Sequence, residues 1–251
     1  MAYDRFALIY DQVMRGVDYP LWVDHILNLA RKFEFDSSRV CDLACGTGSL
    51  ALLLAEKGCE VLGVDRSPTM IEEAKEKAQA AACSSVQWRQ ADITAFECEQ
   101  KFSLVTCLYD SVNYLLKRED VAACFERARR LLEPGGGFIF DVTTEYNILV
   151  NFADYTFAEN FADFSYIWEN AYDINSKIIT SEVTIFQKNG EQFFRFAETH
   201  RQKIYSTKVL EALIRKAGFE ILGAFEGFTL NSPGPKAERI HYVCKEKSPS
   251  A

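Results

Sequence analysis

The chain has 251 residues, 48% of them hydrophobic, a length that allows one main domain with an insertion or two small domains. Its formal net charge of −8, without a stripe of Lys and Arg, disfavours nucleic acid as a partner. The sequence shows no run of membrane-spanning length, no secretory signal and no cysteine spacing that suits zinc. We therefore expect a cytoplasmic monomer or homodimer that binds neither a membrane nor a metal.

Short apolar runs alternate with helical patterns through residue 143. This alternation predicts parallel strands joined by crossover helices, because strands buried on both faces are short and apolar. Ser67 and Pro68 should begin one of these helices, and Gly58 should end the helix before it. The strands are expected at 38–43, 60–65, 86–92, 102–108 and 136–142. The fold class is therefore α/β, with a doubly wound and mostly parallel sheet.

From residue 145 the pattern changes to antiparallel strands. Residues 164–173 and 177–205 have strand-like composition, and Asn189-Gly190 is a strong hairpin signal. A helix ending at Gly218 and two further strands follow. We expect one α/β unit over 1–144 plus 205–251, interrupted by an antiparallel β-insertion over 145–204.

The loop after the first predicted strand has the composition of a ligand cradle. Gly46 and Gly48 allow the backbone to approach a ligand closely, and a helix with unpaired N–H groups follows. Residues 46–51 also satisfy the dinucleotide pattern G-x-G-x-x-G/A. A phosphate-binding P-loop is excluded, because Ser49 and Leu50 stand where Lys and Ser or Thr are required.

Three carboxylates narrow the choice of ligand. Asp65 ends the second predicted strand, where it can accept both hydroxyls of a ribose in either reading of the loop. Asp42 precedes the loop and Asp92 ends the third strand. The carboxylate of Asp42 would not stabilise an anionic pyrophosphate, whereas it would stabilise a ligand that carries an ammonium and a sulfonium. The charges therefore favour S-adenosylmethionine as the cofactor.

The glycine loop and the carboxylates at the strand ends follow one another along the chain as they do in class I S-adenosylmethionine-dependent methyltransferases. The resemblance to this family is close over residues 1–143 and is limited to the topology in the rest of the chain. The resemblance implies a Rossmann-like fold in which the β-insertion covers the active site. Ala44 departs from the fullest form of the first motif, which has a glycine there. The implied cofactor-binding residues are Asp42, Ala44, Cys45, Gly46 and Gly48 around the methionine moiety, Asp65 at the ribose, Arg66, Met70, Asp92 and Ile93 around the adenine, and Leu108 and Tyr109 beside the transferred methyl group.

Residues 1–30 resemble the N-terminal lid of small-molecule and sugar-modifying members of this family. The resemblance makes Tyr10 and Tyr19 cofactor-binding candidates, with Tyr3 and Trp22 as further ones, because aromatic rings suit a sulfonium and exclude water. The alternative is that these rings pack in the core.

The segment after the fourth predicted strand bears on the acceptor. Methylases of nucleobase amino groups or glutamine amides typically have Asn or Asp, then Pro-Pro and an aromatic residue there, and this chain does not. Asp110 and Asn113 could bind substrate or cap the next helix. We take Asp110 and Tyr10 as catalytic candidates.

Two cationic or titratable residues near the end of the chain are further candidates. His200 follows the inserted strands and could serve as a base or bind substrate. Arg239 could bind an anion or take part in a surface ion pair.

The expected activity is methyl transfer to an N, O or C nucleophile of a small molecule by in-line displacement, in which positioning dominates. The alternatives are a tRNA or protein methyltransferase and a non-catalytic S-adenosylmethionine-binding module.

Overall fold

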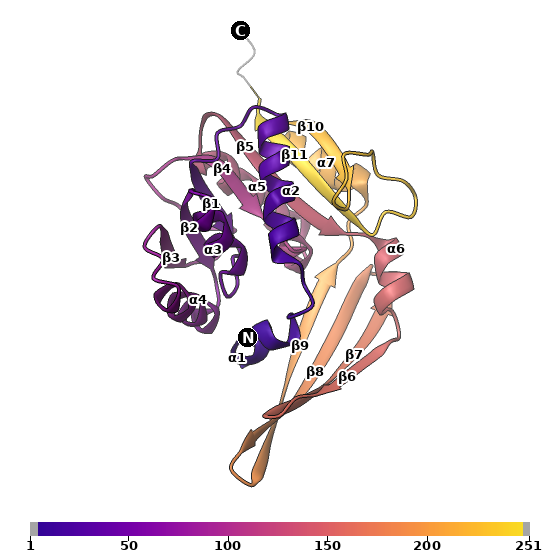
Figure 1. Ribbon diagram of the computed structural model, residues 1–251. Coiled ribbons are helices and arrows are strands. Elements are labelled where there is room, and N and C mark those ends of the chain that lie inside the picture. The colour runs from indigo at the N-terminus through magenta and orange to yellow at the C-terminus, as the bar shows by residue number, and fades with distance from the viewer. Residues whose placement is uncertain (1–4, 248–251) are drawn as a thin grey trace.

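A central sheet of seven strands organises the chain in the computed structural model, which describes residues 5–247 (Figure 1). Its strand order is β10-β11-β5-β4-β1-β2-β3. The strands from β3 to β5 run parallel, and β11 pairs antiparallel with both β5 and β10. Their bounds are β1 Arg39–Leu43, β2 Glu60–Asp65, β3 Val86–Gln90, β4 Phe102–Cys107, β5 Leu132–Thr143, β10 Phe219–Glu226 and β11 Arg239–Glu246.

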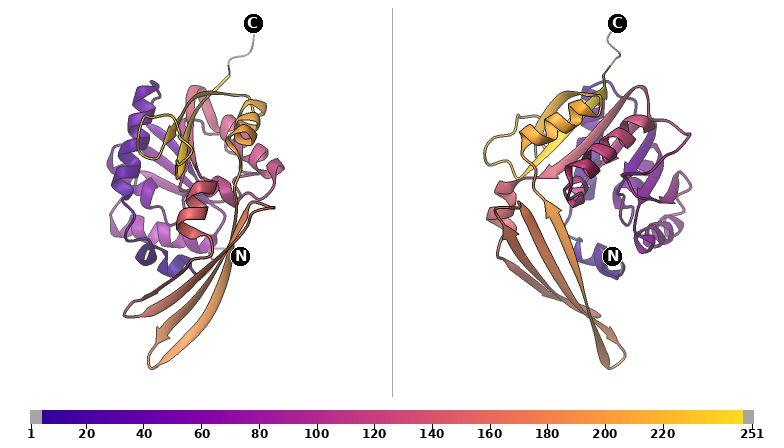
Figure 2. Two further views of the ribbon diagram at one scale, coloured as in Figure 1. Left: turned by 90° about the vertical axis from the view of Figure 1, so that its right-hand side faces the viewer. Right: turned by 180° about the vertical axis from the view of Figure 1, so that it is seen from behind.

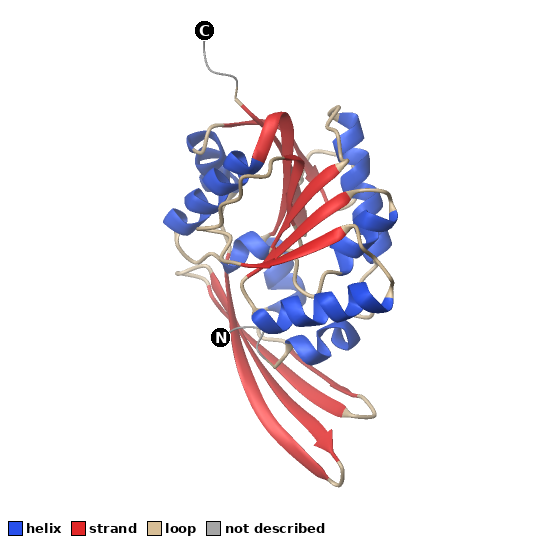
Figure 3. Cartoon of the chain, turned by 90° about the vertical axis from the view of Figure 1, so that its left-hand side faces the viewer, coloured by secondary structure: helices blue, strands red, loops and turns tan. Residues whose placement is uncertain are grey.

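Helices cover both faces of this sheet (Figure 3). One apolar cluster joins the sheet to α2 and α3, and another joins it to α5 and α7. Figure 2 shows α5 and α7 from behind, on the face opposite α2. The helices are α1 Ala7–Val13, α2 Tyr19–Lys32, α3 Ser49–Glu56, α4 Pro68–Ala80, α5 Arg118–Leu131 and α7 Thr207–Lys216. This arrangement confirms the Rossmann-like, doubly wound and mostly parallel α/β fold.

Local sequence signals place several helix ends. Ser67 accepts a hydrogen bond from the Met70 N–H at 3.2 Å, and Pro68 is the first residue of α4. Gly58 and Gly218 follow α3 and α7 with φ of +95° and +90°, a conformation that glycine adopts at little cost. The two glycines therefore end these helices as predicted.

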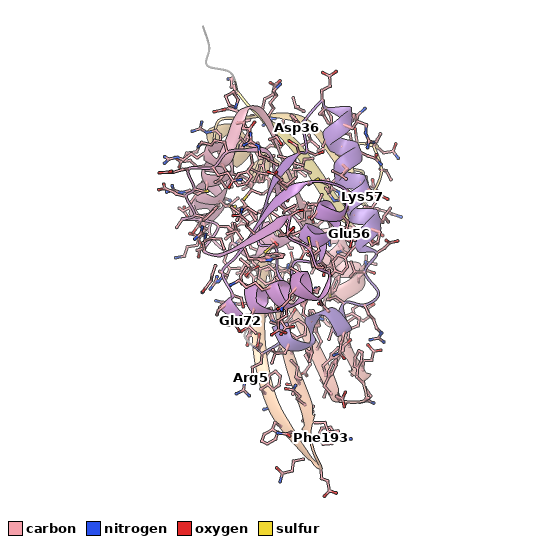
Figure 4. All side chains as sticks on the ribbon, turned by 60° about the vertical axis from the view of Figure 1, so that its left-hand side comes forward. Arg5, Asp36, Glu56, Lys57, Glu72 and Phe193 are labelled. Carbon is pink, nitrogen blue, oxygen red and sulfur yellow. The ribbon has the colours of Figure 1, made fainter. Side chains whose placement is uncertain are left out.

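A second sheet of four antiparallel strands extends away from the central one (Figures 1 and 2). Its inner face buries Phe164, Val183 and Ile185 against Phe6 and Ile9 at α1. Figure 4 labels Phe193 near the far tip of this sheet, in the predicted hairpin. The strands are β6 Thr156–Asn160, β7 Phe164–Asp173, β8 Ile178–Asn189 and β9 Gln192–Lys203.

Some elements lie outside the sequence predictions. The edge strand β6 is mostly exposed and has no apolar alternation, so its sequence carries no strand signal. The others are the 3₁₀ helix η1 (Ser111–Tyr114), the short helix α6 (Glu145–Asn147) and the π-helix η2 (Ile148–Phe152), which contribute residues to the lining of the cavity described below.

Two findings concern residues 5–247 as a whole. No helix among them is long and apolar enough to cross a membrane. The same residues contain no group of His, Cys, Asp and Glu side chains that could hold a metal ion, and the eight cysteines are free thiols.

Candidate cofactor and acceptor site

A cavity of about 490 Å³ lies at the carboxyl ends of the parallel strands, between the central and the second sheet. The predicted cofactor-binding residues line it, apart from Gly48, the further lid candidate Trp22, and Tyr3, which lies outside the described residues. Of the predicted catalytic residues, Tyr10 and Asp110 line it and His200 does not. We call the lining residues within 42–50, 65–70 and 92–93 the cofactor wall, after the ligand predicted there from the sequence, and Asp110, Ser181, Gln202 and Arg239 the acceptor wall, after the ligand proposed for it below.

The loop after β1 turns through left-handed backbone. Ala44 and Gly46 have φ of +59° and +55°. Asp65 fixes the turn, because its Oδ2 accepts from the Gly46 N–H at 2.9 Å and its Oδ1 accepts from the Ser67 N–H at 2.8 Å. The left-handed φ explains why a glycine is the more usual residue at position 44: alanine is strained there.

Gly48 serves packing and not the cavity wall. Its φ is +77°, and an added Cβ would lie 2.3 Å from the Trp88 ring and 3.1 Å from Ala74 Cβ. The glycine therefore lets the start of α3 approach β3 and α4 closely. Gly48 does not line the cavity, and its contact with the cofactor stays a prediction.

Asp42 offers a buried acceptor to a ligand. Only 2% of the residue is exposed, and its Oδ1 accepts from the Thr106 hydroxyl at 2.8 Å. Its Oδ2 has no hydrogen-bond partner among the described residues. Burial raises the pKa of Asp42 to about 7. A cationic ligand group beside Oδ2 would relieve this cost, so the residues present fit the ammonium of S-adenosylmethionine.

The other end of the cofactor wall combines apolar and polar groups. Met70 and Ile93 are 2% and 8% exposed and line the cavity between Asp65 and Asp92. Asp92 Oδ1 accepts from the N–H and hydroxyl of Thr94, which fixes the carboxylate. A lining that combines apolar side chains with carboxylates suits a flat base joined to a ribose.

Hydrogen bonds and an ion pair that were not predicted from the sequence hold helix α1 against the cofactor wall. Thr47 donates to Asp11 Oδ1 at 2.7 Å, and Lys77 Nζ lies 2.5 Å from Asp11 Oδ2 and 3.0 Å from Thr47 Oγ1. Tyr10 and Tyr19, at α1 and α2, line the cavity nearby. The signal of this network in the sequence of α1 is the polar pair Asp11 and Gln12 among apolar and aromatic residues, which is too common to be informative.

The other two lid candidates are Trp22 and Tyr3. Trp22 does not line the cavity, and its ring packs 5.3 Å from that of Tyr109. Tyr3 lies outside the described residues.

The chain turns sharply after β4, where Tyr109 and Asp110 have φ of +60° and +52°. The Asp110 N–H donates to Asp141 Oδ2 at 3.0 Å, and Arg239 Nη2 lies 2.9 Å from Asp110 Oδ1. Arg239 also forms an ion pair with Asp141, and Gln202 donates to Asp110 Oδ2. Asp110 stands at the N-cap position of η1, but its side chain makes no capping hydrogen bond there. Because Arg239 pairs with the buried Asp141 and the partly buried Asp110, it is neither in a surface ion pair nor available as a simple anion site.

The side chains of Asn113 and His200 contact other parts of the protein and do not line the cavity. Asn113 donates to the Lys203 carbonyl at 2.9 Å and accepts from the Thr143 N–H at 3.1 Å, so it joins the strands and leaves the cavity wall to others. His200 is 4% exposed and packs 5.7 Å from the Phe6 ring and 6.3 Å from the Tyr114 ring. Burial lowers the pKa of His200. His200 does not line the cavity, and its role as a base or substrate-binding residue stays a prediction.

Comparisons with known proteins agree with this geometry. Residues 40–136 match the sequence family described as a methyltransferase domain. The chain is 34% identical over 248 residues to YqeM of Bacillus subtilis (strain 168), provisionally named a methyltransferase, with 98% of both chains covered.

Two further matches come from a curated enzyme and a solved structure. A dTDP-3-amino-3,4,6-trideoxy-alpha-D-glucopyranose N,N-dimethyltransferase of Streptomyces venezuelae is 30% identical over 135 residues, which cover 54% of this chain and 53% of that enzyme. The crystal structure of an S-adenosylmethionine-dependent methyltransferase from Clostridium acetobutylicum ATCC 824 matches with a TM-score of 0.86 and 29% identity, over 99% of this chain and 100% of that one. With the Asp42 and Asp65 carboxylates at the glycine loop, these likenesses show that the chain belongs to the class I S-adenosylmethionine-dependent methyltransferases.

Proposed function

We propose that the enzyme transfers the methyl group of S-adenosylmethionine to an amine nitrogen of a small molecule, and that Asp110 binds this amine. The cofactor supplies an electrophilic methyl group on its sulfonium. The observation that carries the proposal is the Asp110 carboxylate, which lines the cavity at the end of β4 beside Tyr109. Leu108 and Tyr109, at the same strand end, are the residues proposed beside the transferred methyl group.

The charge around Asp110 favours a cation or a hydrogen-bond donor. Asp110 and Asp141 share a single guanidinium, that of Arg239, so the group is negative when both carboxyls are ionised. Burial raises the pKa of Asp110, although Arg239 opposes this rise. An ammonium must lose a proton before its nitrogen can attack, and a carboxylate with a raised pKa is suited to accept that proton.

Hydrogen bonds within the second sheet give its part of the acceptor wall the same polarity. Ser181 donates to Asn170 Oδ1 at 2.6 Å, so its remaining capacity toward the cavity is as an acceptor. Gln202 uses an amide N–H on Asp110. A ligand that donates hydrogen bonds, as an amine does, complements these groups. Arg201, an exposed residue that also lines the cavity, would suit an anionic group elsewhere on the same acceptor.

The likeness to the Streptomyces venezuelae enzyme supports a small-molecule amine, since that enzyme is named for N,N-dimethylation of an amino sugar. The formal charge of −8 and the position of the cavity between the two sheets favour a small acceptor over tRNA. We further propose that residues 1–144 and 205–251 bind the cofactor and that 145–204 cover the acceptor. A cytoplasmic location and a monomer or homodimer complete the proposal.

The proposal is tested by methyl transfer from S-adenosylmethionine labelled in its methyl group. The candidate acceptors are amino sugars and other small amines, each paired with its hydroxyl analogue, together with tRNA and peptides. We expect label in the amines, with turnover reduced on the order of 100-fold in Asp110→Asn. Asp173→Asn, an exposed carboxylate in a turn of the second sheet, is the matched control and should retain activity. Transfer to hydroxyl analogues, tRNA or peptides in preference to every amine would refute the proposal.

A further inference from the structure

The corner formed by Tyr109 and Asp110 has a backbone conformation that these residues do not adopt on their own. Two consecutive non-glycine residues have left-handed φ, +60° and +52°. For residues with a Cβ this conformation is unfavourable, and it persists only where surrounding contacts enforce it. Some contact must therefore hold the corner.

Arg239 makes those contacts from a distant part of the chain. It is the first residue of β11 and lies opposite Thr143 of β5 in the sheet. Its guanidinium binds Asp110 and Asp141, and its Cζ lies 5.4 Å from the centre of the Tyr109 ring. The same group lies 4.9 Å from the Trp22 ring of α2. One side chain thus contacts both residues of the corner and two of the elements that surround it.

Asp141 of β5 contacts both Asp110 and Arg239. Its Oδ2 receives the Asp110 N–H at 3.0 Å and also pairs with Arg239, so the backbone and the side chain of Asp110 are tied to the same carboxylate. A planar guanidinium can bridge two carboxylates and stack on aromatic rings at once, whereas the ammonium of lysine is a point charge on a flexible stem. The geometry is therefore specific to arginine, not only to a positive charge.

We infer that Arg239 is a positioning residue, which holds the Tyr109–Asp110 corner so that the Asp110 carboxylate faces the position of the transferred methyl group. The inference rests on the proposed function, because it assigns Asp110 to the acceptor side of the reaction. The inference also assigns a specificity-determining role to Arg239, because this residue fixes the carboxylate that would bind a cationic acceptor.

Two cofactor analogues test this placement without a known acceptor. Sinefungin has a carbon bearing an ammonium where S-adenosylmethionine has its methylated sulfonium, and S-adenosylhomocysteine has neither charge nor methyl there. The affinity ratio of these two ligands, measured by calorimetry, reports on a carboxylate facing that position. We expect the wild type to prefer sinefungin by about tenfold, and Asp110→Asn to remove most of that preference.

Arg239→Lys keeps the charge and should lower the preference to about threefold or less, with S-adenosylhomocysteine affinity within about twofold of wild type. Asp141→Asn, which breaks the same bridge with a side chain of the same shape, should act in the same direction. Arg129→Lys is the matched control, because Arg129 pairs with Glu246 away from the cavity and should leave the ratio unchanged. Thermal melts establish that each variant is folded.

The inference is overturned if Arg239→Lys and Asp141→Asn both retain the full preference, or if Arg239→Lys weakens the two ligands equally. Equal wild-type affinity for the two ligands would also overturn it, since Asp110 would then not face the methyl position. A wild-type preference that Arg239→Lys abolishes, in an enzyme that methylates no amine, would support the positioning role and reject the proposed function. The two failures are therefore distinguishable.

Discussion

The cofactor wall and the acceptor wall face the same cavity but are built in different ways. In the cofactor wall, the loop after β1 is closed by Asp65, which lies nineteen residues from Gly46 at the end of β2, the parallel neighbour of β1. In the acceptor wall, Arg239 reaches Asp110 across 129 positions and Gln202 reaches it across 92. The cofactor wall is thus built by a short continuous motif, whereas the acceptor wall depends on the assembly of two sheets.

The sharpest way to break the cofactor wall alone is Asp65→Ala. We expect S-adenosylmethionine affinity to fall by about 2–4 kcal/mol, because charge-assisted bonds to the ribose hydroxyls are lost. The variant also leaves the Gly46 and Ser67 N–H groups without their partner, so we expect a small loss of thermal stability.

The matched control for Asp65→Ala is Asp36→Ala. Asp36 accepts from the Ser38 N–H in a comparable local turn, and Figure 4 shows it at the far end of the central sheet. It should leave cofactor affinity unchanged. Calorimetric titration of both variants measures the difference, and equal affinities would show that Asp65 does not bind the cofactor.

The packing behind the cofactor wall is tested by Gly48→Ala. The new methyl group would meet the Trp88 ring at 2.3 Å, so we expect the free energy of unfolding to fall by about 2–3 kcal/mol. Gly58→Ala is the control, because it has a left-handed φ of +95° but nothing within 4 Å of the added Cβ. Denaturant unfolding should show a smaller loss for Gly58→Ala, and equal losses would mean that backbone strain and not the clash is responsible.

The charge of the cofactor wall predicts a pH dependence. Burial raises the pKa of Asp42 to about 7, so its carboxyl becomes protonated as the pH falls below that value and no longer attracts the ligand's ammonium. Affinity should therefore fall by about tenfold between pH 8 and pH 6.

Asp42→Asn separates this effect from the titration of other groups. Its affinity should be lower than that of the wild type at pH 8 and nearly independent of pH between 6 and 8. A wild-type profile that is flat over the same interval would contradict the assigned role of Asp42.

The smallest expected effect concerns strain in the loop. Ala44→Gly removes a Cβ from a residue with φ of +59°, and we expect a gain of about 0.5–1 kcal/mol in unfolding free energy. Ala123→Gly, within the regular helix α5, should instead lose about 1 kcal/mol. Thermal denaturation of the pair should show opposite signs, and a loss in both would argue against strain at Ala44.

The same contrast explains what the sequence could predict. Asp42, Gly46 and Asp65 belong to short segments in which strand, turn and helix signals agree, so their shared position follows from a parallel sheet. Gly48 satisfied the same motif, but its closeness to Trp88 is a tertiary contact that no local pattern encodes.

The positions of the acceptor-wall residues were harder to predict from the sequence. The position of Arg239 depends on the antiparallel pairing of β11 with β5, and that of His200 on which face of β9 packs under α1. Neither the register of such pairings nor the face that is buried can be obtained from residue types alone. The sequence therefore identified Asp110 as a candidate without revealing what holds it.

The central claim, that one wall binds the cofactor and the other the acceptor, is tested most directly by comparing Asp42→Asn with Asp110→Asn. For each variant, calorimetry gives the Kd of S-adenosylmethionine, and single-turnover transfer to an amine at saturating cofactor gives the rate of methyl transfer. We predict that Asp42→Asn raises Kd at least about tenfold with a nearly normal rate, and that Asp110→Asn changes Kd by less than about threefold and slows transfer on the order of 100-fold. Parallel losses of affinity and rate in both variants would contradict the division of the cavity into two walls.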